Sequence, residues 1–184
     1  NAGFDVILGN PPYGRYGTLN DNQKKFLIKK NYYGKTGDIS ESFIILALDK
    51  LVKKKGFFSF IIPKGLSYVK SWEETRKSLL NFDIKKLIDA SKAFDEVLYE
   101  QIIFVIQKKN KEDSTIEIGS IRYNSVETSL LSLVYFNDRI FPTGLDEEKI
   151  NILKKIQEKS EPVKNWMDYW YGKGGMTPKI NKNG

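Results

Sequence analysis

The clearest chemical signal in the chain is the tetrapeptide Asn10-Pro11-Pro12-Tyr13, which directly follows a short apolar run. The two prolines fix their φ angles and remove two backbone donors, so the corner is stiff and its carbonyl oxygens are held in place. The Asn10 amide oxygen can accept a hydrogen bond from an amino group, and the Tyr13 ring offers a flat π-face beside it. This combination suits a planar heterocycle whose exocyclic amine must be turned toward an electrophilic methyl group. Carbonyl acceptors could then replace a strong general base.

The tetrapeptide also has a purely structural interpretation. Asn-Pro commonly starts a turn, and a Tyr after it can simply pack against its neighbours. The apolar run Phe4 to Leu8 favours the chemical interpretation. A buried strand there would place the tetrapeptide at the carboxyl edge of a sheet, where α/β proteins bind their ligands.

Composition limits the chemistry available to the chain. Among 184 residues there is no Cys and no His, which excludes disulfides, His-based triads and most zinc or iron sites, so no metal is expected. The absence of Cys fits a reducing compartment and a cytoplasmic location. The net charge of +7 suits a polyanionic partner, although surface charge for solubility explains it equally well. No apolar run is long enough to span a bilayer, so no membrane partner is expected.

The elements around the tetrapeptide predict a layered α/β domain. We expect buried strands at 4–8, 57–62, 84–89 and 100–107, and a polar loop over 10–37 with a short helix near 22–30. A helix should run from Ser40 or Ser42 to about Lys54 and stop at Gly56, and Ser71 should cap another through Leu80. The last two strands leave no room for a crossover helix, which predicts antiparallel pairing.

The composition and residue pattern of the sequence change beyond residue 108. Residues 109–114 are a charged linker, 116–123 alternate like a strand, and 146–160 form an amphipathic helix. Residues 166–171 are dense in aromatics, and 172–184 are predicted to be loop. We expect a domain boundary near residue 123, with a second segment over 124–184.

Residues 4–13 resemble the catalytic motif of adenine-specific DNA methyltransferases. The best match is the gamma class of type II restriction-modification systems, which includes fused restriction-methylation enzymes. The resemblance continues in order through Asp38–Phe43, Gly56, the strand 57–63, and Ala93-Phe94 before the strand 102–106. It implies the C-terminal half of an S-adenosylmethionine-dependent catalytic domain at 1–123, with a partial Rossmann-like sheet of about four strands and flanking helices. Residues 124–184 would be a small helical or irregular extension, comprising a linker helix and the start of a target-recognition region.

The resemblance also implies roles for individual residues. Asn10 and the Pro11 carbonyl would hold the target amine, and Tyr13 would stack on an adenine extruded from the duplex, because a paired amine cannot meet a methyl donor in line. Phe94 would contact the same base edge-on or from its far side. Asn10 and Pro12 would border the cofactor, S-adenosylmethionine, and Ile39 and Phe43 would cover its adenine ring. Ordinary core packing is the alternative for Phe43 and Phe94.

Basic residues populate the loop after the tetrapeptide and could contact phosphates beside an extruded base. A solvated loop would have the same composition, although interleaved Tyr16, Tyr32 and Tyr33 favour nucleic acid. The candidate DNA-binding residues are Arg15, Lys24, Lys25, Lys29, Lys30 and Lys35.

The resemblance implies that the sequence is a fragment. The glycine-rich cofactor loop of the family and its acidic cofactor ligands are not in it, so we expect weak cofactor binding or none by this chain alone. The expected partners are double-stranded DNA and, in the same polypeptide, the N-terminal half of the catalytic domain and a target-recognition domain. Strand 4–8 should then lie at an exposed edge, which a second copy of the chain could also cover.

Two other functions stay open. The same tetrapeptide could serve a methyltransferase acting on a protein glutamine or on an RNA amino group, but the long loop after Tyr13 and the trailing aromatic region favour DNA. A non-catalytic DNA-binding remnant is the other alternative, and the intact Asn10 and Tyr13 speak against it.

Overall fold

The computed structural model describes residues 3–95, 97–110, 115–122, 125–132, 140–145, 147–161, 168–172 and 175–179. The chain divides into two compact units, Asn1–Asp146 and Glu147–Gly184, which are described separately below. Within the described residues, no helix has the length and apolar character needed to cross a membrane.

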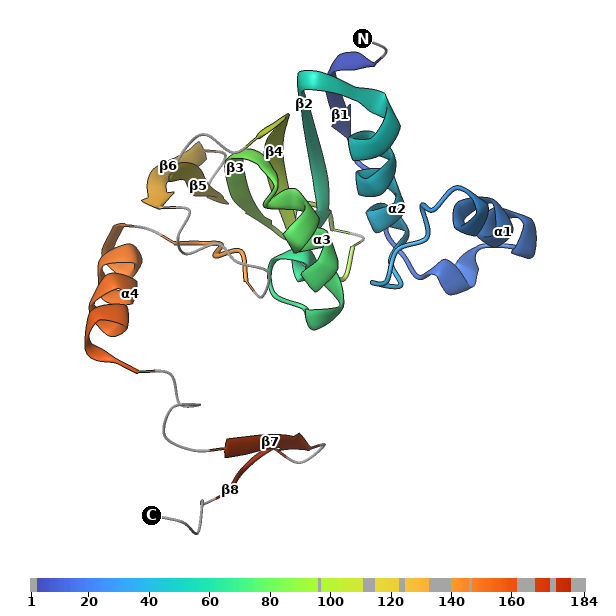
Figure 1. The fold of residues 1–184 in the computed structure, drawn as a ribbon. Coiled ribbons are helices and arrows are strands. Elements are labelled where there is room, and N and C mark those ends of the chain that lie inside the picture. Colours follow the sequence, from blue (N-terminus) through green and yellow to red (C-terminus); the bar gives the residue numbers. More distant parts are fainter. Residues whose placement is uncertain are drawn as a thin grey trace. The chain divides into compact units, whose positions relative to one another are not determined.

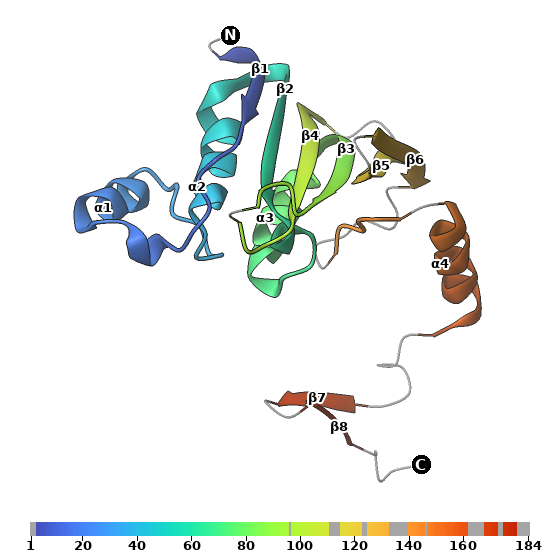
Figure 2. The ribbon, with the colours of Figure 1, turned by 180° about the vertical axis from the view of Figure 1, so that it is seen from behind.

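A six-stranded sheet forms the centre of the first unit, in the order β1-β2-β4-β3-β5-β6 (Figure 1; Figure 2 shows it from behind). The β1–β2 and β3–β5 pairs are parallel, whereas β2–β4, β3–β4 and β5–β6 are antiparallel. The predicted α/β class and the antiparallel β3–β4 pair are therefore confirmed. The strands are β1 (Phe4–Gly9), β2 (Val52–Pro63), β3 (Phe82–Ser91), β4 (Gln101–Asn110), β5 (Thr115–Arg122) and β6 (Ser125–Ser132).

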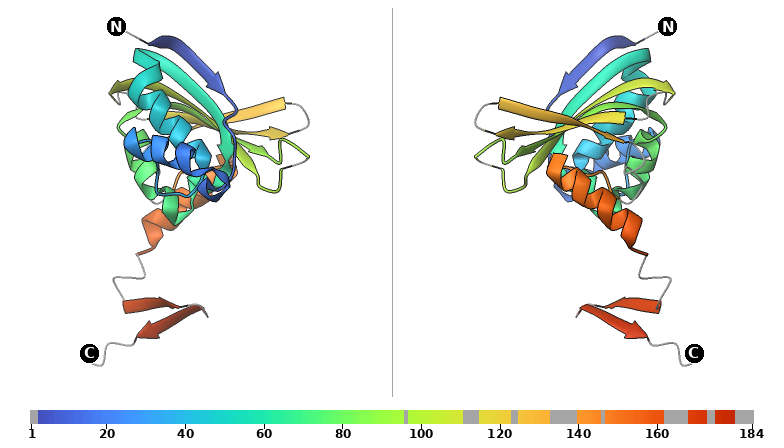
Figure 3. Two further views of the ribbon diagram at one scale, coloured as in Figure 1. Left: turned by 90° about the vertical axis from the view of Figure 1, so that its right-hand side faces the viewer. Right: turned by 90° about the vertical axis from the view of Figure 1, so that its left-hand side faces the viewer.

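Two helices cover one face of this sheet, α2 (Ile39–Leu46) and α3 (Glu73–Leu79), as the edge-on views show (Figure 3). The side chains beneath them alternate along β2 and β4, and the rings of Phe58, Phe60 and Phe104 meet edge to face. Their burial supplies the apolar core that holds the sheet and the helices together. A third helix, α1 (Asp21–Lys29), lies in the loop after the tetrapeptide and begins with a capping box made by Asn20 and Gln23.

The helix predicted to reach Lys54 ends earlier than expected. After α2 the chain makes one π-helical turn, Ala47–Leu51, and β2 begins at Val52. Gly56 is therefore not a helix stop. Pairing jumps from Phe4↔Val52 to Val6↔Phe57, so residues 53–56 bulge out of β2. A Cβ on Gly56 would stand 3.0 Å from the carbonyl oxygens of Phe4 and Asp5, and the glycine thus permits β1 to approach closely.

The cap predicted at Ser71 is also wrong. Ser71 lies in a 3₁₀ turn, Lys70–Trp72, and α3 starts after Trp72 without a side-chain cap. The helix is fixed instead by the fully buried Arg76, whose Nη1 donates to the carbonyl oxygens of Leu66 at 2.8 Å and Val69 at 3.0 Å. A buried guanidinium that donates to two carbonyls locks the turns before α3 against the helix itself.

The sheet extends further than the predicted four strands. The predicted strand at 116–123 is β5, and it pairs with β6, which the sequence did not predict. Lys109 belongs to β4 rather than to a linker, while 111–114 lie outside the described residues. The boundary expected near residue 123 falls between two paired strands, and the first compact unit continues to Asp146. Whether the two units correspond to catalytic and target-recognition regions stays a prediction.

The edge strand β1 is not buried on both faces as its sequence suggests. Among the described strands it pairs only with β2, and its side chains at Phe4, Val6 and Leu8 are 63%, 57% and 77% exposed. The expectation of an exposed edge is met. An apolar edge strand of this kind is a template for pairing with further chain.

The second unit contains the predicted helix, α4 (Glu147–Lys159). It also contains an antiparallel hairpin of β7 (Asp168–Gly172) and β8 (Gly175–Lys179), where loop was predicted over 172–184. Part of the aromatic cluster, including Trp166, lies outside the described residues.

Candidate functional site

The tetrapeptide leaves the sheet at the carboxyl end of β1. Asn10 and Pro12 are exposed, Pro11 is buried, and Tyr13 is half-buried. The Tyr13 hydroxyl donates to the carbonyl oxygen of Ile61 in β2 at 3.0 Å. The corner is thus stiffened by its prolines and tied to the neighbouring strand by a phenol.

Tyr13 is a neutral side chain over the physiological range. Burial, and to a smaller extent the negative charge of Asp38, raises the pKa of Tyr13 to about 12. The phenol therefore keeps the proton that it donates to Ile61, and its ring carries no charge.

Five predicted catalytic residues line a single cavity of about 610 Å³, which we call the corner cleft. The topology of the sheet explains why these residues lie together. β4 runs antiparallel to β2, so its first residue, Gln101, pairs with Pro63 at the end where β1 also finishes. The loop from β3 to β4, which carries Phe94, therefore lies beside the tetrapeptide. The lining residues are Asn10, Pro11, Pro12, Tyr13, Ala93, Phe94, Asp95 and Val97.

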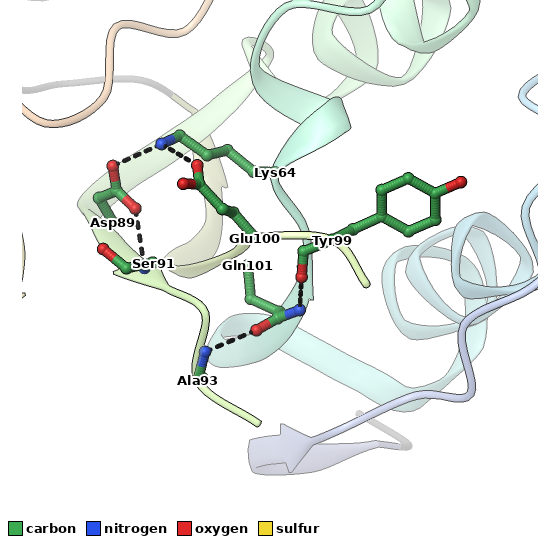
Figure 4. A network of polar contacts seen from close by, with 7 residues as sticks. All are labelled: Lys64, Asp89, Ser91, Ala93, Tyr99, Glu100 and Gln101. Carbon is green, nitrogen blue, oxygen red and sulfur yellow. Dashed lines mark hydrogen bonds and ion pairs between the residues drawn. The ribbon is translucent and has the colours of Figure 1, made fainter. Parts of the chain in front are cut away.

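Polar contacts hold the two ends of the Phe94 loop (Figure 4). The Gln101 side chain accepts a hydrogen bond from the Ala93 amide at 2.8 Å and donates to the Tyr99 carbonyl oxygen. Beside it, the Lys64 ammonium contacts Asp89 at 2.8 Å and Glu100 at 2.7 Å. Burial alone would lower the pKa of Lys64, but its hydrogen bonds to these two carboxylates outweigh burial and raise it.

A second cavity, of about 620 Å³, lies on the other side of Pro12, and we call it the apolar pocket. It contains three of the four predicted cofactor-binding residues, Pro12, Ile39 and Phe43. The fourth, Asn10, lines the corner cleft and not this pocket. Phe43 is 39% exposed, so it is not an ordinary core residue despite its helical spacing. The remaining lining residues are Leu19, Asn20, Asn22, Gln23, Phe26, Leu27 and Ser42.

The sequence interpretation missed the contribution of α1 to the apolar pocket. Leu19 precedes the N-cap of α1, whereas Phe26 and Leu27 lie within the helix, and all three are apolar residues in an otherwise polar stretch. These apolar residues were the available signal. The short helix near 22–30 was predicted, but its surroundings are dense in lysine and it was considered only for phosphate contacts.

The loop between Tyr13 and α2 is ordered by its own tyrosines and a buried acid. Tyr16 stacks on Tyr33 with ring centroids 4.1 Å apart, and its hydroxyl lies 2.8 Å from the Ser42 hydroxyl. Glu41 accepts hydrogen bonds from the Thr36 amide at 2.8 Å and the Thr75 hydroxyl at 2.7 Å. The three tyrosines were expected to favour contact with nucleic acid, but Tyr16 and Tyr32 are buried and cannot make such a contact. Tyr33 is partly exposed.

The candidate DNA-binding residues lie at the surface. Lys25, Lys29 and Lys30 on α1 and its C-cap are exposed, as are Arg15 and Lys35, whereas Lys24 is half-buried. Because α1 also lines the apolar pocket, one helix carries both an apolar face and a basic one. Among the described residues, no group of three or more acidic side chains could hold a metal ion.

The chain is similar to known proteins in sequence and in fold. The chain is 36% identical over 181 residues to the type II methyltransferase M.HindII of Haemophilus influenzae, covering 85% of this chain and 35% of that protein. Its fold is similar to that of a Listeria monocytogenes protein assigned to the class I S-adenosylmethionine-dependent methyltransferases, with a TM-score of 0.52, 17% identity, and coverage of 68% and 38% of the two chains. It is also similar to the protein of the DrdV–DNA complex, with a TM-score of 0.51, 18% identity, and coverage of 78% and 18%.

The chain spans about a third of the length of its Haemophilus relative. The family model for the Eco57I restriction-modification methylase matches residues 1–95, more than half of the 184, and includes the tetrapeptide, α2 and the Phe94 segment. The chain therefore belongs to the Eco57I restriction-modification methylase family.

Proposed function

We propose that this chain carries the base-binding part of a DNA methyltransferase. The enzyme would transfer a methyl group from S-adenosylmethionine to the exocyclic amine of an adenine extruded from a specific DNA sequence, as part of a cytoplasmic restriction-modification enzyme. The observation that carries the proposal is the corner cleft, where Asn10 to Tyr13 and Phe94 face one cavity from two separate loops.

Asn10 and Pro11 would orient the amine. The Asn10 amide oxygen and the Pro11 carbonyl oxygen would accept hydrogen bonds from its two N–H groups, which leaves the nitrogen lone pair free to point at the methyl donor. Because the corner is rigid, these acceptors do not need to reorganise when positive charge develops on the nitrogen.

Two aromatic rings would hold the base itself. Tyr13 would stack on one face of the adenine, and Phe94 would contact the same base from across the cleft. A stacked base gains about 1–3 kcal/mol per aromatic partner, which offsets the few kcal/mol lost when it leaves the duplex. The neutral Tyr13 phenol suits this role, since it is fixed by Ile61 and does not ionise.

The apolar pocket fits the adenine ring of the cofactor. Ile39 and Phe43 give it apolar walls, and Pro12 separates it from the corner cleft, so a ligand there would lie directly beside the target base. S-adenosylmethionine would supply an electrophilic methyl group at that boundary. The lining residues include no carboxylate for ribose hydroxyls. We therefore assign the rest of the cofactor site to the N-terminal half of the catalytic domain in the same polypeptide, with sequence reading in a target-recognition domain.

The basic face of α1 would contact the DNA backbone. Lys25 and Lys29 lie on α1 and Lys30 is its C-cap; this helix lines the apolar pocket, which shares Pro12 with the corner cleft. Arg15 and Lys35 lie in the same loop. Contacts of this kind position a protein on duplex DNA without reading its sequence.

Transfer of a labelled methyl group by the full-length protein tests the proposal. With duplex DNA, RNA and protein offered separately, we expect label only in DNA and only on adenine. Label on a protein glutamine or on RNA would favour the second function class. A protein that binds duplex DNA but transfers nothing, and whose Asn10→Ala variant behaves identically, would be the non-catalytic remnant.

A further inference from the structure

The Phe94 loop has little burial of its own to hold it in place. Nearly all of its described residues are exposed, with Leu98 at 92% and Tyr99 at 68%. Among its described residues, one backbone hydrogen bond lies inside the loop, from the Val97 amide to the Phe94 carbonyl oxygen at 3.3 Å. A segment with so few buried contacts is free to open locally unless its ends are fixed.

Gln101 fixes both ends with one side chain. It is fully buried at the first position of β4, where its neighbours in the sheet set its orientation. Its amide oxygen accepts from the Ala93 amide at 2.8 Å, and its amide nitrogen donates to the Tyr99 carbonyl oxygen (Figure 4). An amide NH can only donate and a carbonyl can only accept, so the two partners use both ends of the side-chain amide.

A charged cluster closes the base of the loop next to Gln101. Asp89 accepts from the Ser91 amide at 2.9 Å and pairs with Lys64, which also contacts Glu100 on the other side of the loop. The Lys64 backbone amide donates to the Glu100 carbonyl oxygen at 2.8 Å. This cluster anchors the stems at Ser91 and Glu100, whereas Gln101 reaches further and holds Ala93, the residue before Phe94.

We propose that Gln101 is a positioning residue that holds the Phe94 ring across the corner cleft from Tyr13. It does not line the cleft, so it acts on the Phe94 ring through the two loop residues that it holds, Ala93 and Tyr99. The inference rests on the proposed function, because the value of a fixed Phe94 lies in holding an extruded base.

The structural half of the inference is tested by amide hydrogen exchange on the full-length protein. Gln101→Met keeps the length and burial of the side chain but removes both hydrogen bonds. Water can replace them at the exposed loop, so we expect the fold to survive. We expect the Ala93 amide to exchange at least roughly tenfold faster in this variant. Gln107→Met is the matched control, since Gln107 lies on the same strand and its side chain donates to Lys55 instead.

The functional half is tested by a double-mutant cycle on methylation of duplex DNA. If Gln101 acts through Phe94, Gln101→Met should lower kcat about tenfold in the natural sequence and less than about twofold in a Phe94→Ala background. KM for S-adenosylmethionine should stay unchanged, because Gln101 is not part of the apolar pocket. A duplex with 2-aminopurine at the target position should become more fluorescent when the natural protein extrudes that base. We expect this increase in fluorescence to be smaller with Gln101→Met and unchanged with Gln107→Met.

The possible failures are distinguishable. The inference would be overturned if Gln101→Met lowered kcat equally in the natural sequence and in the Phe94→Ala background. It would also be overturned if Gln101→Met left the exchange rate of the Ala93 amide unchanged. In both cases adenine methylation by the natural sequence would still be observed. Absence of methylation by the natural sequence would instead overturn the proposed function. If Gln101→Met fails to fold, Gln101→Asn takes its place, because it keeps the amide group but is too short to span both partners.

Discussion

The two walls of the corner cleft are held by different physical means. The Asn10–Tyr13 wall is rigid through its covalent structure, with two prolines at the end of a strand and one hydrogen bond from Tyr13 to Ile61. The Phe94 wall is an exposed loop whose position depends on side chains at its base, above all Gln101. In the proposed function, the first wall orients the amine and the second holds the base.

The largest effect is expected from the rigid wall. In the proposed function, Asn10→Ala removes an acceptor for the reacting amine, and removal of one preorganised group of this kind costs about 10²–10³ in kcat. Steady-state methylation of duplex DNA by the full-length protein checks this, with binding of the duplex as the control that should stay unchanged. A loss confined to KM would mean that Asn10 binds substrate without orienting it.

The second prediction concerns the Phe94 wall. Phe94→Ala removes one aromatic partner of the base, which is worth about 1–3 kcal/mol, or roughly a five- to 150-fold loss in kcat. Phe94→Tyr keeps a ring in the same place and should retain most of the activity. If both variants lose activity equally, the ring does not act by stacking.

The two walls differ in how far they could be predicted from the sequence. The tetrapeptide after an apolar run is a local signal, so Asn10 to Tyr13 could be placed at a sheet edge from the residues alone. Phe94 could be selected only through family resemblance, since an aromatic next to a strand is usually core. Gln101 gave no signal, because its partners are set by how the loop from β3 returns to β4.

The errors at Gly56 and Ser71 have a common physical origin. Both residues carry strong local preferences, for a helix end and a helix cap, and tertiary contacts overrode them. Gly56 serves the close approach of β1, and buried Arg76 replaces the cap of α3. The strand β6 was missed for a related reason, since it depends on pairing with β5 rather than on its own pattern.

A smaller effect should follow when the rigid wall is loosened without removal of a functional group. Pro12→Ala frees one φ angle, which should lower the free energy of unfolding by about 0.4–1 kcal/mol. Because no functional group is removed, kcat should fall by only a few-fold. Because Pro12 lines both cavities, KM for S-adenosylmethionine should rise by a similar factor. An unchanged cofactor KM would show that the two cavities do not share this wall in the working enzyme.

The smallest effect on rate is expected from Tyr13→Phe, which keeps the stacking ring and removes the hydroxyl that bonds to Ile61. Methylation should change less than about twofold, while the free energy of unfolding should fall by about 0.5–1.5 kcal/mol for the lost hydrogen bond.

The pH dependence of the free energy of unfolding separates the contribution of the Tyr13 hydroxyl from that of its ring. The pKa of Tyr13 is raised from 10.0 to about 12 in the folded chain, so its contribution to stability is complete below pH 10 and is lost as the pH rises through about 12. The stability difference between the natural sequence and Tyr13→Phe should therefore be constant up to pH 10 and shrink above it, as measured by denaturant unfolding. A difference that already shrinks near neutral pH would show that the phenol is not held as described, and the rigid wall would then owe its stiffness to the prolines alone.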